Sequence, residues 1–292
     1  MNDAELAPGL PRHVVAGVVD RALAEDLGAA GDVTTTATIA ASAIASADLV
    51  PRQDGVVAGL PVAAYVFEAV GQGRLRVEFG SADGARVTAG EVLATVHGPV
   101  RDLLTAERTA LNLVGHLSGV ATLTRRWVDA IAGTRAQIRD TRKTLPGLRA
   151  LEKYAVRAGG GVNHRMSLSD AALVKDNHVA AAGGVVQAFE LVRAAYPGLA
   201  LEIEVDTVQQ AREVIEAGAE LVLLDNMSPD DMREVVAFAA GRCRLEASGG
   251  LQLDNALAVA ETGVDYLSIG ALTHSAPQLD IGLDINTGIT VG

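Results

Sequence analysis

A cluster of basic residues is the first feature of this sequence that could do chemistry. Between Arg135 and Arg165 the chain carries eight lysines and arginines against two acidic residues, which gives a local charge of +6. The whole chain has a formal charge of -12, so the rest of it carries -18. Such a stretch is often a solvated helix face, but this one interrupts an acidic protein beside glycine-rich turns. It therefore predicts a site for a small polyanionic ligand.

A second set of polar residues recurs at a regular spacing in the C-terminal half. Glu204, Asp225, Glu246 and Ser268 follow one another at intervals of 21, 21 and 22 residues, near the ends of short apolar runs. This period suits a repeated strand and helix joined by short loops. Carboxylates at successive strand ends could bind Mg²⁺, although acids at helix N-termini also occur for the helix dipole alone.

Alternating strands and helices must position these residues. The patterns predict strands over 137–141, 172–175, 201–206, 221–225, 244–248 and 266–269. Capping residues and glycines delimit helices over 207–218, 228–241 and 254–262. The predicted fold class is α/β, either a parallel α/β barrel or a doubly wound sheet if the strands do not close. The first hundred residues lack the period and predict a separate α+β domain, which ends near a helix starting around Leu103.

Ligands in parallel α/β folds bind at the carboxyl ends of the strands, so the residues there form a candidate site. In chain order they are Arg142, Lys143, the GGGVNHR segment (159–165), Lys175, Glu204, Asp225, Ser248, Gly249, Gly250, Gly270 and His274. The glycine-rich turns could hold a phosphate through backbone N–H groups. Less specific roles stay open, because the lysines could pair with Glu204 and Asp225, the Gly-Gly could be a plain turn, and His274 could be a loop histidine.

Several longer strings of the sequence are recognisable. They are GDVTT (31–35), RTALNLVGHLSG (108–119), RDTRKTLPGLRALEKYAVRAGGGVNHR (139–165), KDNH (175–178), EVD (204–206), LLDN (223–226), EASGG (246–250) and GVDYLSIGALTHS (263–275). This ordered set resembles the quinolinate phosphoribosyltransferases, which are type II phosphoribosyltransferases. The resemblance implies a pentosyltransferase that converts quinolinate and phosphoribosyl pyrophosphate (PRPP), with Mg²⁺, into nicotinate mononucleotide, pyrophosphate and CO₂ in NAD biosynthesis.

The resemblance also implies an architecture and an assembly. It suggests an N-terminal α+β sandwich domain over 1–111, completed by 277–292, and an incomplete parallel α/β barrel over 112–276. It suggests at least a homodimer, in which Arg108 reaches the site of the partner subunit.

Residue roles follow from the same resemblance. The residues expected around the quinolinate carboxylates are Arg108, Arg142, His164, Arg165 and Lys175. Those expected at PRPP are Lys143, Glu204, Asp225, Ser248, Gly249, Gly250, Gly270 and His274, with Mg²⁺ at Glu204 and Asp225, directly or through PRPP or water. The catalytic set is Lys143, Lys175, Glu204 and Asp225. Guanidinium groups suit the two carboxylates of quinolinate, and catalysis is expected to depend on positioning and electrostatics without a covalent intermediate.

Three other functions compete with this interpretation. A Schiff-base aldolase barrel would use Lys143 or Lys175, whose pKa nearby cations could lower. A nicotinate phosphoribosyltransferase would use the mono-acid without decarboxylation, and a relative of the same fold could bind an anionic metabolite without turnover.

Composition excludes further classes. The net charge of -12 argues against binding to nucleic-acid backbones. The longest stretch without a charged residue, Thr109–Thr124, falls short of a bilayer span, and the N-terminus resembles no secretory signal. We therefore expect a cytoplasmic protein. The single cysteine, Cys243, lies between two arginines that could lower its pKa, although a structural thiol is the simpler expectation.

Overall fold

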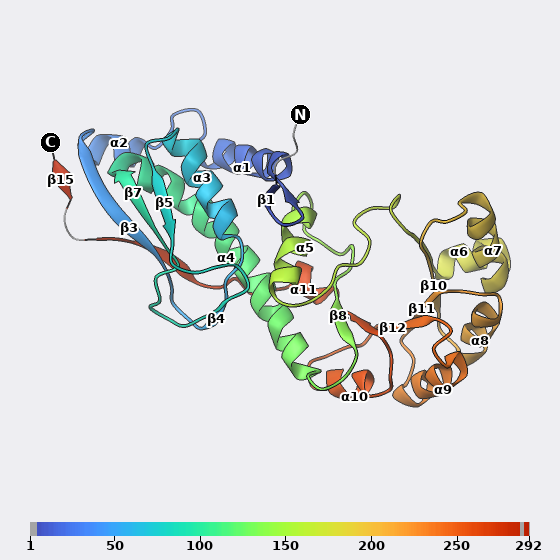
Figure 1. Ribbon diagram of the computed structural model, residues 1–292. Helices are drawn as coiled ribbons and strands as arrows, with labels where there is room; N and C mark the ends of the chain where they lie inside the picture. The colour runs from blue at the N-terminus through green and yellow to red at the C-terminus, as the bar shows by residue number, and fades with distance from the viewer. Residues whose placement is uncertain (1–4, 287–288, 292) are drawn as a thin grey trace. The chain divides into compact units, whose positions relative to one another are not determined.

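The computed structural model (Figure 1) describes residues 5–286 and 289–291. The chain forms two compact units. Unit 1 combines Met1–Arg125, Thr144–Gly160 and Thr273–Gly292, and unit 2 combines Arg126–Lys143 and Gly161–Leu272. The segment 144–160, expected in the barrel, thus clusters with unit 1. Residues 1–4, 287–288 and 292 of the expected N-terminal domain lie outside the described residues.

Unit 2 is built on a six-stranded parallel sheet. Its strands are β8 (Gln137–Arg139), β9 (Ala172–Val174), β10 (Leu201–Val205), β11 (Leu221–Asp225), β12 (Arg244–Ser248) and β13 (Tyr266–Ser268). Their order is β8-β13-β12-β11-β10-β9, so the chain runs round the sheet and only the seam between β8 and β9 is unpaired. Closing that seam would complete a barrel. The predicted incomplete parallel α/β barrel is confirmed.

Helices connect the strands of unit 2. They are α6 (Asp176–Ala182), α7 (Val185–Ala195), α8 (Val208–Glu216), α9 (Pro229–Ala239), α10 (Ala256–Ala260) and α11 (Ala271–His274). The hydroxyl of Thr207 accepts the N–H of Gln210 and that of Ser228 accepts the N–H of Asp231, so each starts a helix as an N-cap. Helices α7, α8 and α9 lie along one side of β10, β11 and β12 (Figure 1).

The first strand of unit 2 is shorter than the predicted 137–141, for a local reason. After Arg139 the backbone N–H of Asp140 donates to the carbonyl of Val162, 3.2 Å away, and Val162 forms a bridge beside Arg139. The chain therefore leaves the sheet at Asp140, and Arg142 and Lys143 lie beyond the strand.

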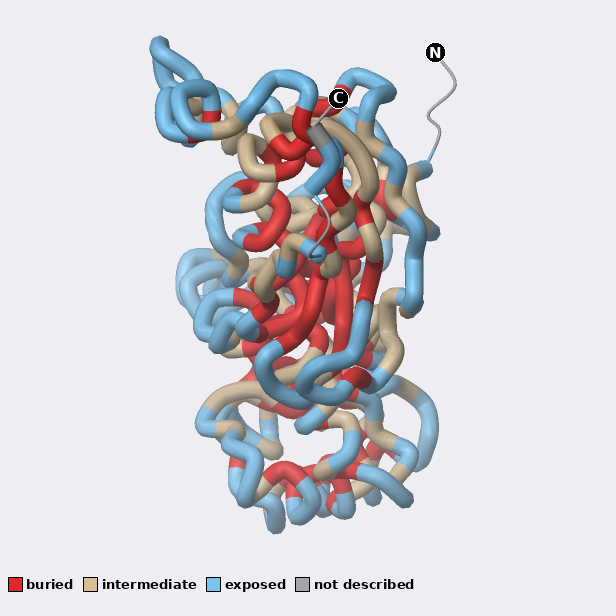
Figure 2. Tube along the Cα trace, turned by 90° about the vertical axis from the view of Figure 1, so that its left-hand side faces the viewer, coloured by how far each residue is buried: buried red, intermediate tan, exposed pale blue. Residues whose placement is uncertain are grey.

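Unit 1 contains an antiparallel sheet in the order β14-β3-β7-β5, with β15 also paired to β3. Its strands are β3 (Ala43–Pro51), β5 (Arg76–Phe79), β7 (Ala94–Pro99), β14 (Ile281–Ile285) and β15 (Thr290–Val291). Two small pairs are β1 (Glu5–Ala7) with β2 (Leu10–Pro11) and β4 (Gly55–Val56) with β6 (Arg86–Val87). Alternate residues of β3 are buried, from Ala43 to Leu49, whereas Ile44 is exposed, so one face of the sheet packs on the core. Buried residues concentrate along such strands and exposed ones in the loops (Figure 2).

The helices of unit 1 are α1 (Arg12–Leu27), α2 (Val33–Thr38), α3 (Leu60–Gly71), α4 (Val100–Ala130) and α5 (Arg149–Ala158). Helix α4 buries Leu103, Ala106, Ala110 and Val114, which recur every three or four residues along one face. With 31 residues α4 is long enough to cross a bilayer, but it is too polar. Within the described residues, no helix has both the length and the apolar content that a membrane span requires.

Candidate active site

The carboxyl ends of the unit 2 strands carry the predicted polar residues. Lys175 directly follows β9, Glu204 is the fourth residue of β10, and Asp225 and Ser248 end β11 and β12. Asp225 and Ser248 are register partners, so they lie side by side. Four of the residues predicted from strand ends therefore meet at one end of the sheet.

Lys175 and Glu204 form an ion pair between their side chains. The lysine side chain is 47% exposed and the carboxylate 12%, so the charged amine stays accessible while its partner is largely enclosed. The ion pairing considered above as a less specific role is thus real for this pair. It still leaves ammonium N–H groups that can point to a ligand.

Two arginines add positive charge beside this pair. Burial and then the positive charge of Arg142 lower the pKa of Arg165, while the carboxylates of Glu202 and Asp170 oppose this shift. Arg165 is partly buried, and its Nη1 donates to the carbonyl of Ala171 at 2.9 Å. Two neighbouring guanidinium groups repel each other unless anions lie between or beside them. The arrangement suits a ligand with two carboxylates.

A buried carboxylate holds the loop that carries Arg165. Asp140 is fully buried and accepts the backbone N–H of His164 at 2.7 Å and the side-chain amide of Asn163 at 2.6 Å. Lys143 lies three residues beyond Asp140 and is exposed, with its N–H donated to the hydroxyl of Thr141. The Asp140 side chain therefore fixes the turn between β8 and the basic residues.

The turn after β12 has the geometry of a small anion cradle. Gly249 and Gly250 both have left-handed backbones, with φ of +83° and +61°. A Cβ on Gly249 would lie 2.2 Å from Oδ1 of Asn226, whose amide in turn donates to Asp225 at 2.7 Å. A cavity of about 210 Å³ lies beside this turn, lined by Asn226, Met232, Gly249, Gly250 and Asn255 among others. Consecutive left-handed glycines expose backbone N–H groups of the kind that bind phosphate.

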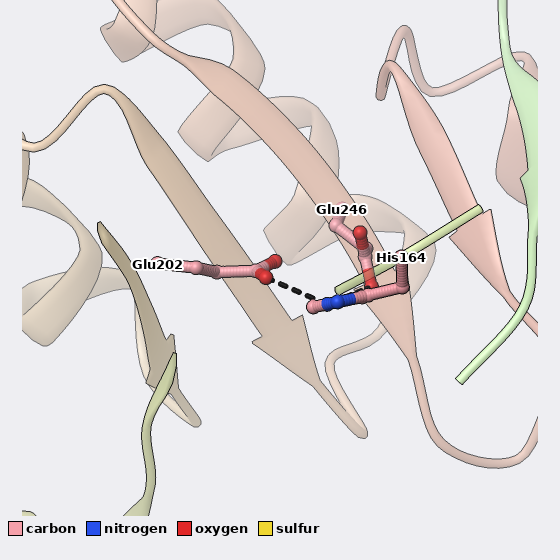
Figure 3. Close-up of side chains that lie close together, drawn as sticks. All are labelled: His164, Glu202 and Glu246. Atoms are coloured by element: carbon pink, nitrogen blue, oxygen red, sulfur yellow. Dashed lines mark ion pairs between the residues drawn. The ribbon is translucent and has the colours of Figure 1, made fainter. Parts of the chain in front are cut away.

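A buried cluster of charged side chains lies within unit 2, as Figure 3 shows. Nε2 of His164 is 2.7 Å from Oε2 of Glu202 and 3.7 Å from Oε1 of Glu246. Arg139 donates to the other oxygen of Glu246 at 2.6 Å and stacks on Tyr266, 4.7 Å from the ring centre. Since β11 separates β10 from β12, this contact requires a sheet curved toward the cluster.

Burial is the main influence on the carboxyl groups of this cluster. It raises the pKa of both Glu202 and Glu246 to about 7, although Arg139 opposes the shift in each case. Both carboxylate oxygens of Glu202 and Oε1 of Glu246 have no hydrogen-bond partner within the described residues, which adds to the penalty for charge.

The donor set of the cluster resembles a metal site, but its protons do not fit one. His164, Glu202 and Glu246 bring ligand atoms within 4.8 Å of one another. However, Nδ1 of His164 accepts the backbone N–H of Arg165 at 2.7 Å, so the proton of the neutral ring lies on Nε2. A metal ion at Nε2 would displace this proton, which could not move to Nδ1 because the Arg165 N–H already points there. Arg139 also pairs with Glu246.

The remaining predicted residues lie in unit 1 or follow the last strand of unit 2. Arg108, on α4, and His274, which ends α11, belong to unit 1. The Arg108 side chain is 63% exposed, and His274 bonds its neighbour Ser275 through Nδ1 at 2.6 Å. Gly270 lies between β13 and α11, partly buried. Cys243 is half-buried, and burial raises the pKa of its thiol to about 11, as expected of a structural thiol.

Sequence reasoning missed Glu202 and the role of Arg139, and it placed Glu246 near a strand end. Glu246 lies in the middle of β12 and is fully buried. The sequence signal for Glu202 was the segment LEIEVD (201–206), in which acidic and apolar residues alternate. Residues two apart on a strand share a face. Glu202 therefore points to the same side as Glu204.

An open parallel α/β barrel with arginines, a lysine and carboxylates at its strand ends defines an enzyme class that handles small polyanionic substrates. Family models for quinolinate phosphoribosyl transferase match the chain, the N-terminal domain over residues 32–118 and the C-terminal domain over 120–284. The chain belongs to the quinolinate phosphoribosyltransferase family.

Known relatives agree over almost the whole length. A nicotinate-nucleotide pyrophosphorylase [carboxylating] of Mycobacterium leprae is 54% identical over 271 residues, 91% of this chain and 95% of that protein. A probable enzyme of the same name from Bacillus subtilis is 42% identical, over 89% of this chain and 90% of that one. The structure of the Francisella tularensis nicotinate-nucleotide pyrophosphorylase has a TM-score of 0.90 at 36% identity, with 98% of this chain and all of that chain covered.

Proposed function

We propose that this chain transfers the phosphoribosyl group of PRPP to quinolinate and releases pyrophosphate and CO₂, with nicotinate mononucleotide as the product. This is a step of de novo NAD biosynthesis. The observation that carries the proposal is the match of the chain to both family domains, with Lys175, Glu204 and Asp225 at the carboxyl end of the parallel sheet.

Quinolinate is bound at the basic side of the site in this proposal. Arg142 and Arg165 each receive a carboxylate, and Lys175 adds a third positive charge from the end of β9. The influence of the Arg142 charge on the pKa of Arg165 supports this assignment, because a dianion offsets repulsion between two cations. A mono-acid would leave part of this charge unmatched, which argues against a nicotinate-specific enzyme.

The phosphoribosyl group is bound at the opposite side. Glu204 and Asp225 face the ribose hydroxyls, and the Ser248–Gly250 turn and Gly270 hold the 5′-phosphate, with His274 nearby. Lys143 lies between the quinolinate and the phosphoribosyl group. The left-handed glycines and the adjoining cavity support the phosphate assignment.

Mg²⁺ is the proposed cofactor, and the oxygen donors of Glu204 and Asp225 are of the type it prefers. One oxygen of each is already engaged, by Lys175 and by the Asn226 amide. These two carboxylates would hold the ion together with PRPP or water. When bound, Mg²⁺ supplies positive charge to the departing pyrophosphate.

The residues then act mainly by position and charge. Departure of pyrophosphate leaves positive charge on the ribose, which Glu204 and Asp225 stabilise. After the ribose joins the ring nitrogen, the positive charge of that nitrogen stabilises the electron pair that CO₂ leaves on the adjacent ring carbon. A proton from water then takes the place of CO₂ on that carbon. The guanidinium groups hold the ring during this step.

A steady-state comparison of two acids tests the proposal. Quinolinate or nicotinate is supplied with PRPP and Mg²⁺, and mononucleotide formation is followed. We expect turnover with quinolinate, loss of activity with EDTA and recovery with added Mg²⁺. Turnover of nicotinate alone would contradict the assignment of the basic side, and borohydride trapping of Lys143 or Lys175 would favour an aldolase.

A further inference from the structure

A second cavity of unit 2 lies at the amino ends of the strands, on the edge of the sheet opposite the candidate active site. It has a volume of about 440 Å³ and is lined by residues that precede or begin β8, β13, β12 and β11, four strands that are consecutive in the sheet. Strand β12 begins with Arg244 at this cavity and ends with Ser248 at the candidate active site, so about 13 Å separates the two residues. The charged residues of the lining are Arg135, Glu220, Arg242, Arg244 and Asp265.

The three arginines of this cavity lack a close carboxylate partner within the described residues. Nη2 of Arg135 is 3.6 Å from Oδ1 of Asp265, and neither Arg242 nor Arg244 forms an ion pair in the described part of the chain. By contrast, Arg233 on α9 lies 2.7 Å from an aspartate. Since the chain has 36 acidic and 24 basic residues, three arginines around one cavity form an unusual concentration of positive charge.

Each of these guanidinium groups is held by an uncharged acceptor. Arg242 donates from Nε and Nη2 to two carbonyl groups in the last turn of α9, at 3.2 and 2.6 Å. Arg135 donates to the carbonyl of Gly263, and Arg244 donates to the hydroxyl of Tyr266. Carbonyl and hydroxyl oxygens fix the orientation of a guanidinium group without neutralising its charge, and each group has five N–H donors. Donors therefore remain at all three arginines for an anion.

The size and the chemistry of the cavity suit a phosphoryl group. Guanidinium groups bind phosphate oxygens with paired, charge-assisted hydrogen bonds. The volume is about twice the 210 Å³ of the cavity beside the Gly249–Gly250 turn, so an organic group attached to the phosphate has room. We propose that this cavity is a second anion site, which binds a phosphoryl group through Arg135, Arg242 and Arg244. The site is distinct from the proposed phosphoribosyl site and does not rest on the proposed function.

Cys243 lies in the lining of this cavity and can report on its occupancy. It is the single cysteine of the chain, so a thiol reagent reads this cavity and no other. Burial raises the pKa of the thiol to about 11, and the charge of Arg242 opposes the shift. Alkylation requires the thiolate. A bound anion would cover the sulfur and also disfavour the thiolate, so occupancy should slow alkylation.

The rate of alkylation by iodoacetamide, followed by mass spectrometry of the intact protein at one alkaline pH, tests the proposal. Saturating inorganic phosphate should slow the reaction of wild type about threefold or more relative to chloride at equal ionic strength. In the double variant Arg242→Gln, Arg244→Gln, the rates in phosphate and in chloride should be equal. Arg233→Gln removes an exposed cation on α9 that does not line the cavity, and it should retain the wild-type difference.

A second arm with ribose 5-phosphate identifies the occupant. Protection at a lower concentration of the ester than of inorganic phosphate would assign the site to a phosphate monoester. Protection at equal or lower concentrations of inorganic phosphate would assign it to the free ion. Both results support the site.

Equal alkylation rates of wild type in phosphate and in chloride would overturn the proposal. Full protection in the double variant would also overturn it, because the anion would then need neither arginine. If the double variant does not fold, Arg135→Gln carries the test, since this side chain is 63% exposed. It should raise the phosphate concentration for half-maximal protection about fivefold or more, and an unchanged concentration would contradict the proposal. No arm requires turnover, so a failure of the proposed function would leave this result intact.

Discussion

In the proposed function, Arg142 and Lys175 bring charge to the substrate from the segments that follow β8 and β9, and each can be removed separately. Truncation of either residue to alanine should reduce kcat/KM for quinolinate by roughly thirtyfold or more, about 2 kcal/mol of transition-state stabilisation. Lys175→Ala also leaves the nearly enclosed Glu204 without its counter-charge.

A surface variant provides the comparison for these two. Arg193→Ala removes a half-exposed cation from α7 that pairs with Glu190, and its kcat/KM should equal that of wild type. Near-wild-type kcat/KM in Arg142→Ala or Lys175→Ala would refute the placement of the dicarboxylate.

Glu246 makes stability depend on pH in a predictable direction. Burial raises its pKa in the folded state to about 7, from an ordinary value of 4.5. Its contribution to stability is complete below about pH 4.5 and is lost as the pH rises through 7, because ionisation is harder in the fold than in the unfolded chain. Glu246→Gln removes this titration. The free energy of unfolding of the variant minus that of wild type should therefore rise by at least ~1 kcal/mol from pH 5 to pH 8.

Urea unfolding at the two pH values measures this difference directly. The comparison depends on the change with pH, so any loss of the Arg139 contact that is common to both conditions cancels. A difference between variant and wild type that is the same at pH 5 and pH 8 would contradict the assignment of a raised pKa to Glu246.

In the turn after β12, steric contacts restrict which residue can occupy position 249. A methyl group on Gly249 would clash with Asn226, which holds Asp225 through its amide. Gly249→Ala should therefore raise the PRPP KM and lower the free energy of unfolding by at least ~2 kcal/mol.

Gly73 supplies a matched control for this substitution. Its φ of +85° is close to the +83° of Gly249, but a Cβ there would meet nothing within 4 Å. Gly73→Ala should cost about 1 kcal/mol from backbone strain alone and leave PRPP binding intact. Equal effects of the two substitutions on both quantities would show that the Asn226 clash is unimportant.

The elements of unit 2 could be predicted from sequence because each strand and helix is encoded locally. The strands over 221–225 and 244–248 match the structure at both ends. The first is an apolar run between a glycine and a polar strand end, which leaves little choice of bounds. Long-range contacts could not be predicted. The backbone contact of Asp140 with Val162 ends β8 early, and no local pattern encodes it.

The site also combines residues that local sequence predicts with contacts that it does not. Residues at strand ends, such as Lys175 and Asp225, follow from the position of the strands. The cluster of Arg139, His164, Glu202 and Glu246 depends on the curvature of the sheet, which brings non-neighbouring strands together across β11. A strand pattern gives the face of a side chain but not its partner across a barrel.

For the whole molecule, the proposed contribution of Arg108 to a partner's site predicts complementation between two inactive variants. Arg108→Ala and Lys175→Ala should each be nearly inactive alone. A mixed dimer would contain one intact site, so an equal mixture that exchanges subunits should recover about a quarter of wild-type activity.

Subunit exchange must be shown in the same experiment, for instance by native mass spectrometry of chains of different mass. Recovered activity without mixed dimers, or mixed dimers without recovered activity, would contradict the sharing of Arg108. A protein that stays monomeric while fully active would also exclude it.

The most direct test of the proposed reaction is its stoichiometry with quinolinate labelled in the carboxyl group next to the ring nitrogen. With PRPP and Mg²⁺, we expect CO₂, pyrophosphate and nicotinate mononucleotide to form in equal amounts, and no CO₂ without PRPP. Mononucleotide formed without CO₂, or CO₂ released without PRPP, would contradict phosphoribosyl transfer coupled to decarboxylation.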